Sequence, residues 1–166
     1  MLKERLNITS RAKDWRAKIL ANPSEAPFRI GDIVFNSVES ALQGIKLANP
    51  LQRQEVFAMT GFEALRIGRE ITLSIKPGEI RFVFWQDEVI VYNSIKHRLL
   101  LATFIHEKVR QNIAVQEALL STEDLFIYHD VGPENSNTSL PETFYIEILL
   151  AERRLLQRLR NLVIQV

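Results

Sequence analysis

The sequence predicts a mainly α-helical domain with a small β element, that is, an α+β fold. Apolar residues recur at helical spacing in several segments, and residues that favour helix starts precede many of them. Short β-branched and aromatic runs flanked by turn residues predict a few strands. The 166 residues contain no internal repeat, linker or low-complexity tract. We therefore expect residues 1–166 to form a single domain with one core.

Composition limits the class of protein. Hydrophobic residues make up 46% and charged residues 25% of the chain, which is typical of a soluble globular protein. The formal net charge of +1 gives no electrostatic basis for bulk binding to nucleic acid or to an anionic membrane. No apolar run approaches the ~18 residues of a membrane span, and the first residues lack the apolar core of a signal peptide. The expected location is the cytoplasm.

The chain has no cysteine. Disulfides, a thiolate nucleophile and a cysteine-based zinc site are therefore excluded. His97, His106 and His129 lack the spacing of metal ligands. We expect neither a bound metal nor a cofactor, and the sequence leaves the oligomeric state open.

The first third of the chain is divided by turn and cap residues. Residues 6–9 fit either a short strand or the approach to a helix over residues 10–20, and both remain open. Two prolines predict a loop over Asn22–Pro27. The Gly31-Asp32 pair between two short apolar runs predicts a tight hairpin.

Three helices are predicted next. Ser37 is placed to cap a helix that has Glu39 in its first turn. Pro50 suits the start of a second helix that extends to Ala58. Thr60 and Glu63 form a capping-box pattern that opens a third helix running toward Gly68.

The second half of the chain has fewer boundaries. A turn at residues 76–79 precedes a long apolar run that we interpret mostly as one buried helix to about Glu107, with a possible strand over Arg81–Trp85. Asn112 is expected to cap a helix that ends at Leu120. A short strand over Leu125–Tyr128, a polar loop over residues 132–140 and a final helix complete the domain. Ser139 and Glu142 form the capping-box pattern for that helix.

One helix face carries the residues that suggest a ligand site. Glu39, Gln43 and Lys46 stand at i, i+4 and i+7, so their side chains stack on one side of a helix. Asn22 and Arg69 lie in the same segment of sequence. A carboxylate, an amide and cations together suit a polar, phosphorylated, sugar-like ligand. The alternative is a solvated helix stripe, with Arg69 as a cation near a helix C-terminus.

In the order and spacing of these residues the chain resembles the NADAR family, also called YbiA-like, as a divergent member. The first block of matching positions comprises Asn22, Pro27, Phe28, Ser37, Glu39, Gln43, Lys46, Gly68 and Arg69. Later blocks at residues 108–112, 119–122 and 149–154 are similar to the family's K-F-x-Q-N, L-L-x-T and L-M-x-x-R motifs. The resemblance implies a YbiA-like helical domain that spans nearly the whole chain.

Other positions differ from the family pattern. Ser40 stands where the family has a histidine, and the tryptophan before the K-F-x-Q-N block is replaced. In our alignment Tyr128 occupies the place of a family carboxylate. The D-x-x-W-G motif has no counterpart over residues 130–146. These differences favour a second interpretation, a family member that has lost activity.

The resemblance implies cleavage of an N-glycosidic bond in a phosphoribosylated or ADP-ribosylated small molecule or base. Glu39 and Lys46 are then the expected catalytic residues: Glu39 stabilises charge at C1 or activates water, and Lys46 donates a proton or attacks C1. Asn22, Gln43 and Arg69 are the expected substrate-binding residues, with Arg69 on a phosphate. The alternative is a degenerate relative that binds a nucleotide-sugar or a protein partner without turnover.

Overall fold

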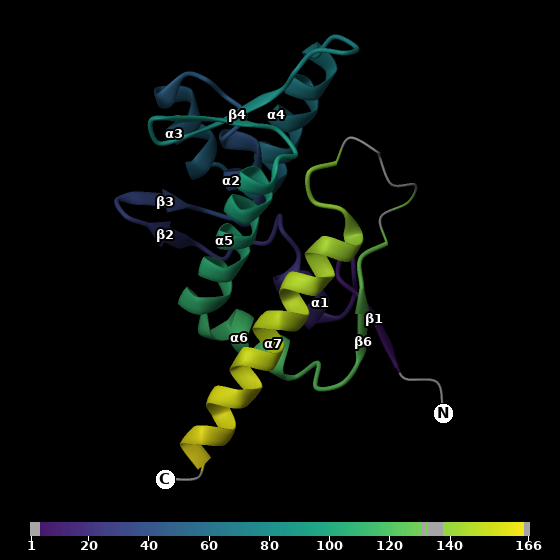
Figure 1. The fold of residues 1–166 in the computed structure, drawn as a ribbon. Helices are drawn as coiled ribbons and strands as arrows, with labels where there is room; N and C mark the ends of the chain where they lie inside the picture. Colours follow the sequence, from purple (N-terminus) through teal and green to yellow (C-terminus); the bar gives the residue numbers. More distant parts are fainter. Residues whose placement is uncertain (1–3, 131, 133–137, 165–166) are drawn as a thin grey trace.

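The structure, a computed structural model, describes residues 4–130, 132 and 138–164 (Figure 1). In chain order its elements are β1 (Arg5–Asn7), α1 (Trp15–Leu20), β2 (Phe28–Ile30), β3 (Ile33–Phe35), α2 (Val38–Gly44), α3 (Pro50–Ala58), α4 (Gly61–Ser74), β4 (Phe82–Trp85), β5 (Glu88–Val91), α5 (Ile95–Gln111), α6 (Ile113–Leu120), β6 (Phe126–Tyr128) and α7 (Glu142–Ile164). The predicted α+β class is confirmed.

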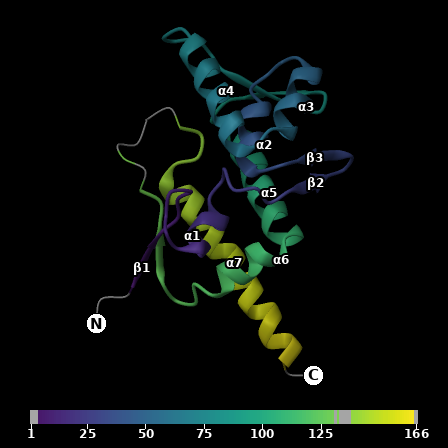
Figure 2. The same cartoon turned by 180° about the vertical axis from the view of Figure 1, so that it is seen from behind.

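The strands that the structure describes form three separate two-stranded sheets. β2–β3 and β4–β5 are antiparallel hairpins, whereas β1 pairs in parallel with β6 from the far end of the chain. Figure 2 shows α2, α3 and α4 grouped at one end of the molecule, with α1, α6 and α7 toward the other. The long helix α5 joins these groups, because it packs against both α2 and α7.

Aromatic side chains fill the centre of the core. The Phe35 ring lies 4.9 Å from Phe28, 4.6 Å from Phe57 and 5.3 Å from Phe104, measured between ring centroids. Trp85 closes this cluster with its centroid 5.5 Å from Phe104. The β2–β3 hairpin, α3, β4 and α5 are therefore held on one another by a shared apolar contact.

Most of the local signals in the first half of the chain act as predicted. The β2–β3 hairpin turns at Gly31, whose φ of +58° favours glycine. Ser37 caps α2 by accepting the Ser40 N–H at 3.0 Å, and Thr60 caps α4 together with Glu63. Helix α3 starts at Pro50. The choice left open at the N-terminus resolves into a short strand, β1, followed by α1 as a separate helix.

The prediction of a buried helix from residue 79 to about residue 107 is wrong over its first half. Residues 82–91 form the β4–β5 hairpin, and α5 begins only at Ile95, capped by Ser94. The hairpin turns at Gln86, which has a φ of +52°. Val83 and Ile90 face the core while their neighbours face outward, which is the period-two pattern of a strand. The suggested strand at residues 81–85 was the correct part.

Two capping predictions in the second half also need correction. Asn112 precedes α6, but its side chain donates to the carbonyls of Lys108 and Pro27 and does not cap the helix. Helix α7 starts at Glu142, three residues after Ser139, so Ser139 does not stand at the N-cap position that the capping-box prediction required. The Glu142 carboxylate accepts the backbone N–H of His129 at 3.1 Å. Residues 133–137 of the predicted polar loop lie outside the described residues.

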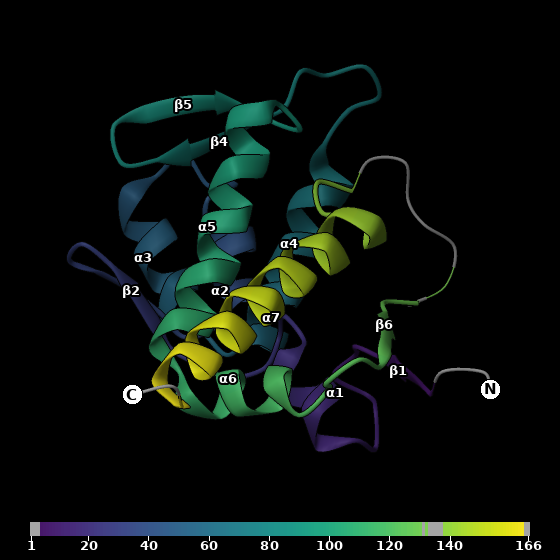
Figure 3. The same cartoon turned by 60° about the horizontal axis from the view of Figure 1, so that its bottom comes forward.

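Helix α7 is the longest helix described, and it crosses the molecule beside α5 (Figure 3). Its first half packs on the core through Tyr145 and Leu149, which are buried. Beyond Leu156 its side chains are mostly exposed. None of the helices in the described part of the chain has the length and apolar content needed to cross a membrane.

Candidate functional site

Helix α2 carries two buried polar side chains side by side. Glu39 is 7% exposed and Gln43 is 8% exposed, and Gln43 Nε2 donates to Glu39 Oε1 at 2.5 Å. Gln43 Oε1 is buried without a hydrogen bond from any described residue. A solvated stripe would not bury these groups, because an unpaired buried polar atom destabilises the fold. The alternative of a solvated helix stripe is therefore excluded for these two residues.

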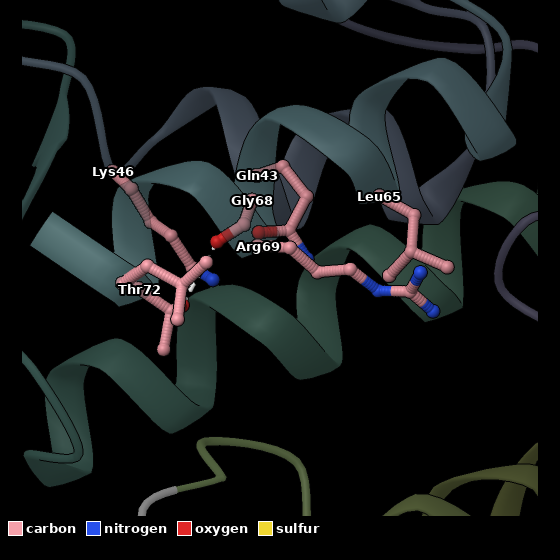
Figure 4. Close-up of a pocket in the computed structure, with 7 residues that line it drawn as sticks. Gln43, Lys46, Leu65, Gly68, Arg69 and Thr72 are labelled. Atoms are coloured by element: carbon pink, nitrogen blue, oxygen red, sulfur yellow. Dashed lines mark hydrogen bonds between the residues drawn. The ribbon is translucent and has the colours of Figure 1, made fainter.

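A glycine brings α4 close to this part of α2. A Cβ built on Gly68 would lie 1.9 Å from Gln43 Oε1, so Gln43 could keep its present position only beside a glycine. Figure 4 shows Gln43 directly beside Gly68, with the Arg69 side chain running along α4 toward Leu65. Because α4 continues to Ser74, Arg69 is not in the last turn of its helix. The alternative of a cation near a helix C-terminus is therefore excluded for Arg69.

Lys46 lies just beyond the end of α2 and not within it. The helix ends at Gly44 with Ile45 as its C-cap, and the Lys46 N–H donates to the Gln43 carbonyl at 3.2 Å. This turn keeps the Lys46 side chain on the same side as Glu39. Burial lowers the pKa of Lys46 to about 8, against the opposing attraction of Glu39. The Lys46 amine therefore changes its charge close to neutral pH.

These residues surround two adjoining cavities. The smaller, about 190 Å³, is lined by Asn22, Glu39, Gln43 and Lys46, and by Tyr92 and residues 138–140 among others. The larger, about 770 Å³, has Asn22 and Glu39 in its wall and three arginines, Arg11, Arg66 and Arg69. The structure thus brings Asn22, Glu39, Gln43 and Lys46 into one cavity. Arg69 lines the larger cavity, and together with Gln43 and Lys46 it also lines a third cavity of about 390 Å³ (Figure 4). Their roles remain predictions.

Opposing effects act on the pKa of the Glu39 carboxyl group. Burial is the largest and raises the pKa of Glu39 above the usual value for glutamate. The hydrogen bond from Gln43 and the positive charges of Lys46, His129 and Arg69 act in the opposite direction. A further positive charge in the cavity would favour the carboxylate strongly, because little water is present to screen it.

The loop that carries Asn22 is held by groups from distant parts of the chain. Lys108 Nζ donates to the carbonyls of Leu20 and Ala21 at 3.2 and 2.8 Å, and Tyr145 Oη also donates to Leu20 at 2.8 Å. The Asn22 carbonyl accepts the Glu39 N–H at 3.0 Å. The loop therefore fixes the start of α2 and the wall of both cavities at once.

Lys108 is an unusual lysine, because its side chain lies inside the core. It is 2% exposed, and burial lowers its pKa to about 7. Its acceptors are the last carbonyls of α1, which favour a cation, so the ammonium retains partners inside the core. Arg110, in contrast, is exposed and pairs with Glu107.

The sequence analysis missed four residues of the site: Arg11, Arg66, Tyr92 and His129. His129 lines both cavities, and Tyr92 lines the smaller one. His129 follows β6 directly, and the parallel pairing of β6 with β1 brings it beside the α1–β2 loop. The His129-Asp130 pair after a predicted strand was the available signal, but a histidine in a loop is too common to single out. The adjacent Tyr128 lines a different groove, between β6 and α7.

The chain is similar in sequence to known bacteriophage proteins. Residues 14–154 match the family described as bacteriophage protein GP30.3. The chain belongs to this family. A 17.1 kDa uncharacterized protein from the Gp30–rIII intergenic region of Enterobacteria phage T4 is 26% identical over 137 residues, which cover 81% of this chain and 88% of the relative.

A solved structure is similar over almost the whole chain. The NMR structure of the Escherichia coli protein YbiA superposes with a TM-score of 0.64, covering 96% of this chain and 89% of YbiA at 15% sequence identity. At this identity the likeness shows the fold alone, and the expected YbiA-like fold is confirmed. Among the described residues no three histidine, aspartate or glutamate side chains gather as a metal site would require.

Proposed function

We propose that this chain is an N-glycosidase of the NADAR type, a divergent member that cleaves the N-glycosidic bond of a phosphoribosylated or ADP-ribosylated small molecule or base. One observation carries the proposal: a buried carboxylate, Glu39, lies with Lys46 in a small cavity that adjoins a larger, arginine-lined one. The YbiA-like fold and the ordered motif blocks support it.

The shape of the site suggests how such a substrate would bind. Phosphate groups suit the larger cavity, where Arg11, Arg66 and Arg69 offer charge and several N–H donors. The ribose then occupies the junction of the cavities, beside Asn22 and Glu39. The leaving base extends into the smaller cavity, toward Lys46.

Each residue then has a chemical role. As the C1–N bond breaks, positive charge develops on the ribose, and the Glu39 carboxylate stabilises it more than it stabilises the neutral ground state. Lys46, whose pKa is about 8, is mostly an ammonium ion at neutral pH and can protonate the leaving nitrogen. Gln43 orients Glu39 through its 2.5 Å hydrogen bond.

The test is turnover of a panel of ribosylated metabolites, nucleotides and ADP-ribosylated guanine, followed by mass spectrometry of the released base. We expect release by the wild type and a loss of at least ~100-fold in Glu39→Gln, a typical effect of removing a group that acts in the transition state. Glu55→Gln, the same change at an exposed position of α3, serves as the matched control and should remain active.

Two results would decide against the proposal. Full activity in Glu39→Gln would remove the carboxylate from the mechanism. No turnover by the wild type on any member of the panel, together with measurable binding of ribose 5-phosphate, would favour the alternative of a relative that binds without turnover.

A further inference from the structure

We infer that His129 is a third catalytic residue, the general base that takes a proton from the attacking water. This inference rests on the proposed glycosidase function and adds the group that this mechanism otherwise lacks. His129, Asn22 and Glu39 are the residues that line both cavities, so His129 lies at the junction where the ribose C1 is placed.

The hydrogen bonds of His129 fix which ring nitrogen faces the substrate. Nδ1 lies 2.5 Å from the carbonyl oxygen of Ile8. A carbonyl only accepts, so Nδ1 carries the proton, and Nε2 of the neutral ring is left as an acceptor. No described residue shares a hydrogen bond with Nε2. The basic nitrogen is therefore available to a water molecule in the cavity.

The ring is also held rigidly. The backbone N–H of His129 donates to the Glu142 carboxylate at 3.1 Å, and the ring packs at a steep angle against Tyr145 with 5.1 Å between centroids. Tyr145 is itself fixed by its hydrogen bond to the Leu20 carbonyl. A base that is preorganised in this way needs little rearrangement to act.

The hydrogen bond of the ring survives the proton transfer, because the Ile8 carbonyl can accept from Nδ1 in both protonation states. Histidine held by a fixed acceptor on Nδ1 is a common arrangement for a general base.

The complete step balances. Water oxygen bonds to C1 while the C1–N bond breaks and its electron pair moves to the leaving nitrogen. That nitrogen takes a proton from Lys46 Nζ, and the proton released by the water passes to Nε2 of His129. The products are the free base and a ribose with a C1 hydroxyl. Exchange with solvent then returns a proton to Lys46 and removes one from His129.

His129→Asn is the most informative variant, because its amide N–H can replace Nδ1–H toward Ile8 while Nε2 is lost. His129→Ala removes the ring and leaves room for free imidazole. His106→Ala is the matched control, because His106 pairs with Glu152 near the middle of α7 and lines neither cavity. The assays are turnover of the substrate found in the panel, binding of ribose 5-phosphate, and turnover with added imidazole.

We expect both His129 variants to lose ~100-fold or more in turnover while they keep ribose 5-phosphate affinity within about threefold. Imidazole should restore activity in His129→Ala and leave His106→Ala unchanged. Three results would overturn the role of His129 while leaving the proposed function intact. They are wild-type activity in His129→Asn, a loss of ribose 5-phosphate binding that accompanies the loss of turnover, and a failure of imidazole to restore activity. No wild-type turnover overturns this inference together with the proposed function.

Discussion

At the scale of single residues, Lys46 decides between two mechanisms. An amine that attacks C1 must be neutral, whereas a proton donor must be charged. Burial lowers the pKa of Lys46 only to about 8, because the nearby Glu39 carboxylate favours the ammonium form while Arg81 opposes it. At pH 7 the ammonium therefore predominates by about tenfold. Protonation of the leaving group is the role that this charge state supports.

The corresponding prediction concerns pH. Turnover should fall as the pH rises through about 8, because the ammonium form of Lys46 is lost there. Lys46→Met should reduce turnover by about 100-fold and should lack this alkaline decline. A pH profile of kcat for both proteins provides the measurement. As a second readout, borohydride should trap no imine on the wild type; a covalent adduct at Lys46 would show attack by the amine.

At the scale of elements, the site depends on how closely α2 and α4 approach. Gly68 allows the contact, and Gly61 has a similar role at the start of α4, where a Cβ would lie 2.2 Å from the Pro23 carbonyl oxygen. The first glycine sets the position of Gln43 and the second sets the loop that carries Asn22. Both cavities are thus shaped by backbone packing before any charged group contributes.

Gly68→Ala tests this dependence. The added Cβ would overlap Gln43 Oε1, so Gln43 must move and its hydrogen bond to Glu39 must be weakened. We expect a loss of about 1–3 kcal/mol in the free energy of unfolding, typical of overpacking, and a clear fall in ribose 5-phosphate affinity. Urea denaturation and calorimetry measure the two effects. Glu55→Ala, at an exposed position of α3, should change neither by much; unaltered binding in Gly68→Ala would show that the contact is dispensable.

The elements also show which features were accessible from the sequence. Caps at Ser37 and Thr60 and the turn at Gly31 act within a few residues, so local patterns were enough to place α2, α4 and the first hairpin. The β4–β5 hairpin was missed because its turn, at Gln86, has no glycine, asparagine or proline. Without that signal an apolar run fits a helix and a strand equally well.

The site also contains residues that the sequence predicts and residues that it does not. Glu39, Gln43 and Lys46 lie within about two helical turns of one another, so their spacing was enough to group them. His129 and Lys108 come to the Asn22 loop from positions about ninety or more residues away in sequence. Their placement depends on tertiary contacts such as the β1–β6 pairing, which one sequence without relatives does not specify.

At the scale of the whole molecule, buried ionisable groups link stability to pH. His97 is 1% exposed, and its Nδ1 accepts the Asn93 N–H at 3.0 Å, which only the neutral ring can do. Burial, together with the positive charges of Lys46, Arg81 and Arg98, lowers the pKa of His97 to about 4. A pKa that is lower in the folded chain makes stability rise with pH, and this holds for His97 and also for Lys108. The raised pKa of Glu39 makes stability fall as the pH rises.

His97 gives the sharpest test of this balance. Between about pH 6.5 and pH 4 the unfolded chain binds a proton at His97 that the folded chain does not, so stability is present above this window and falls as the pH drops through it. The shift corresponds to about 3 kcal/mol at most. In His97→Asn the amide oxygen can replace Nδ1 as the acceptor. Urea denaturation at pH 7 and pH 4 should therefore show that the free energy of unfolding falls less in this variant than in the wild type, by about 3 kcal/mol at most. His106→Asn, at the half-exposed His106, should follow the wild-type curve. Parallel losses in the wild type and His97→Asn would assign the acid sensitivity to other groups.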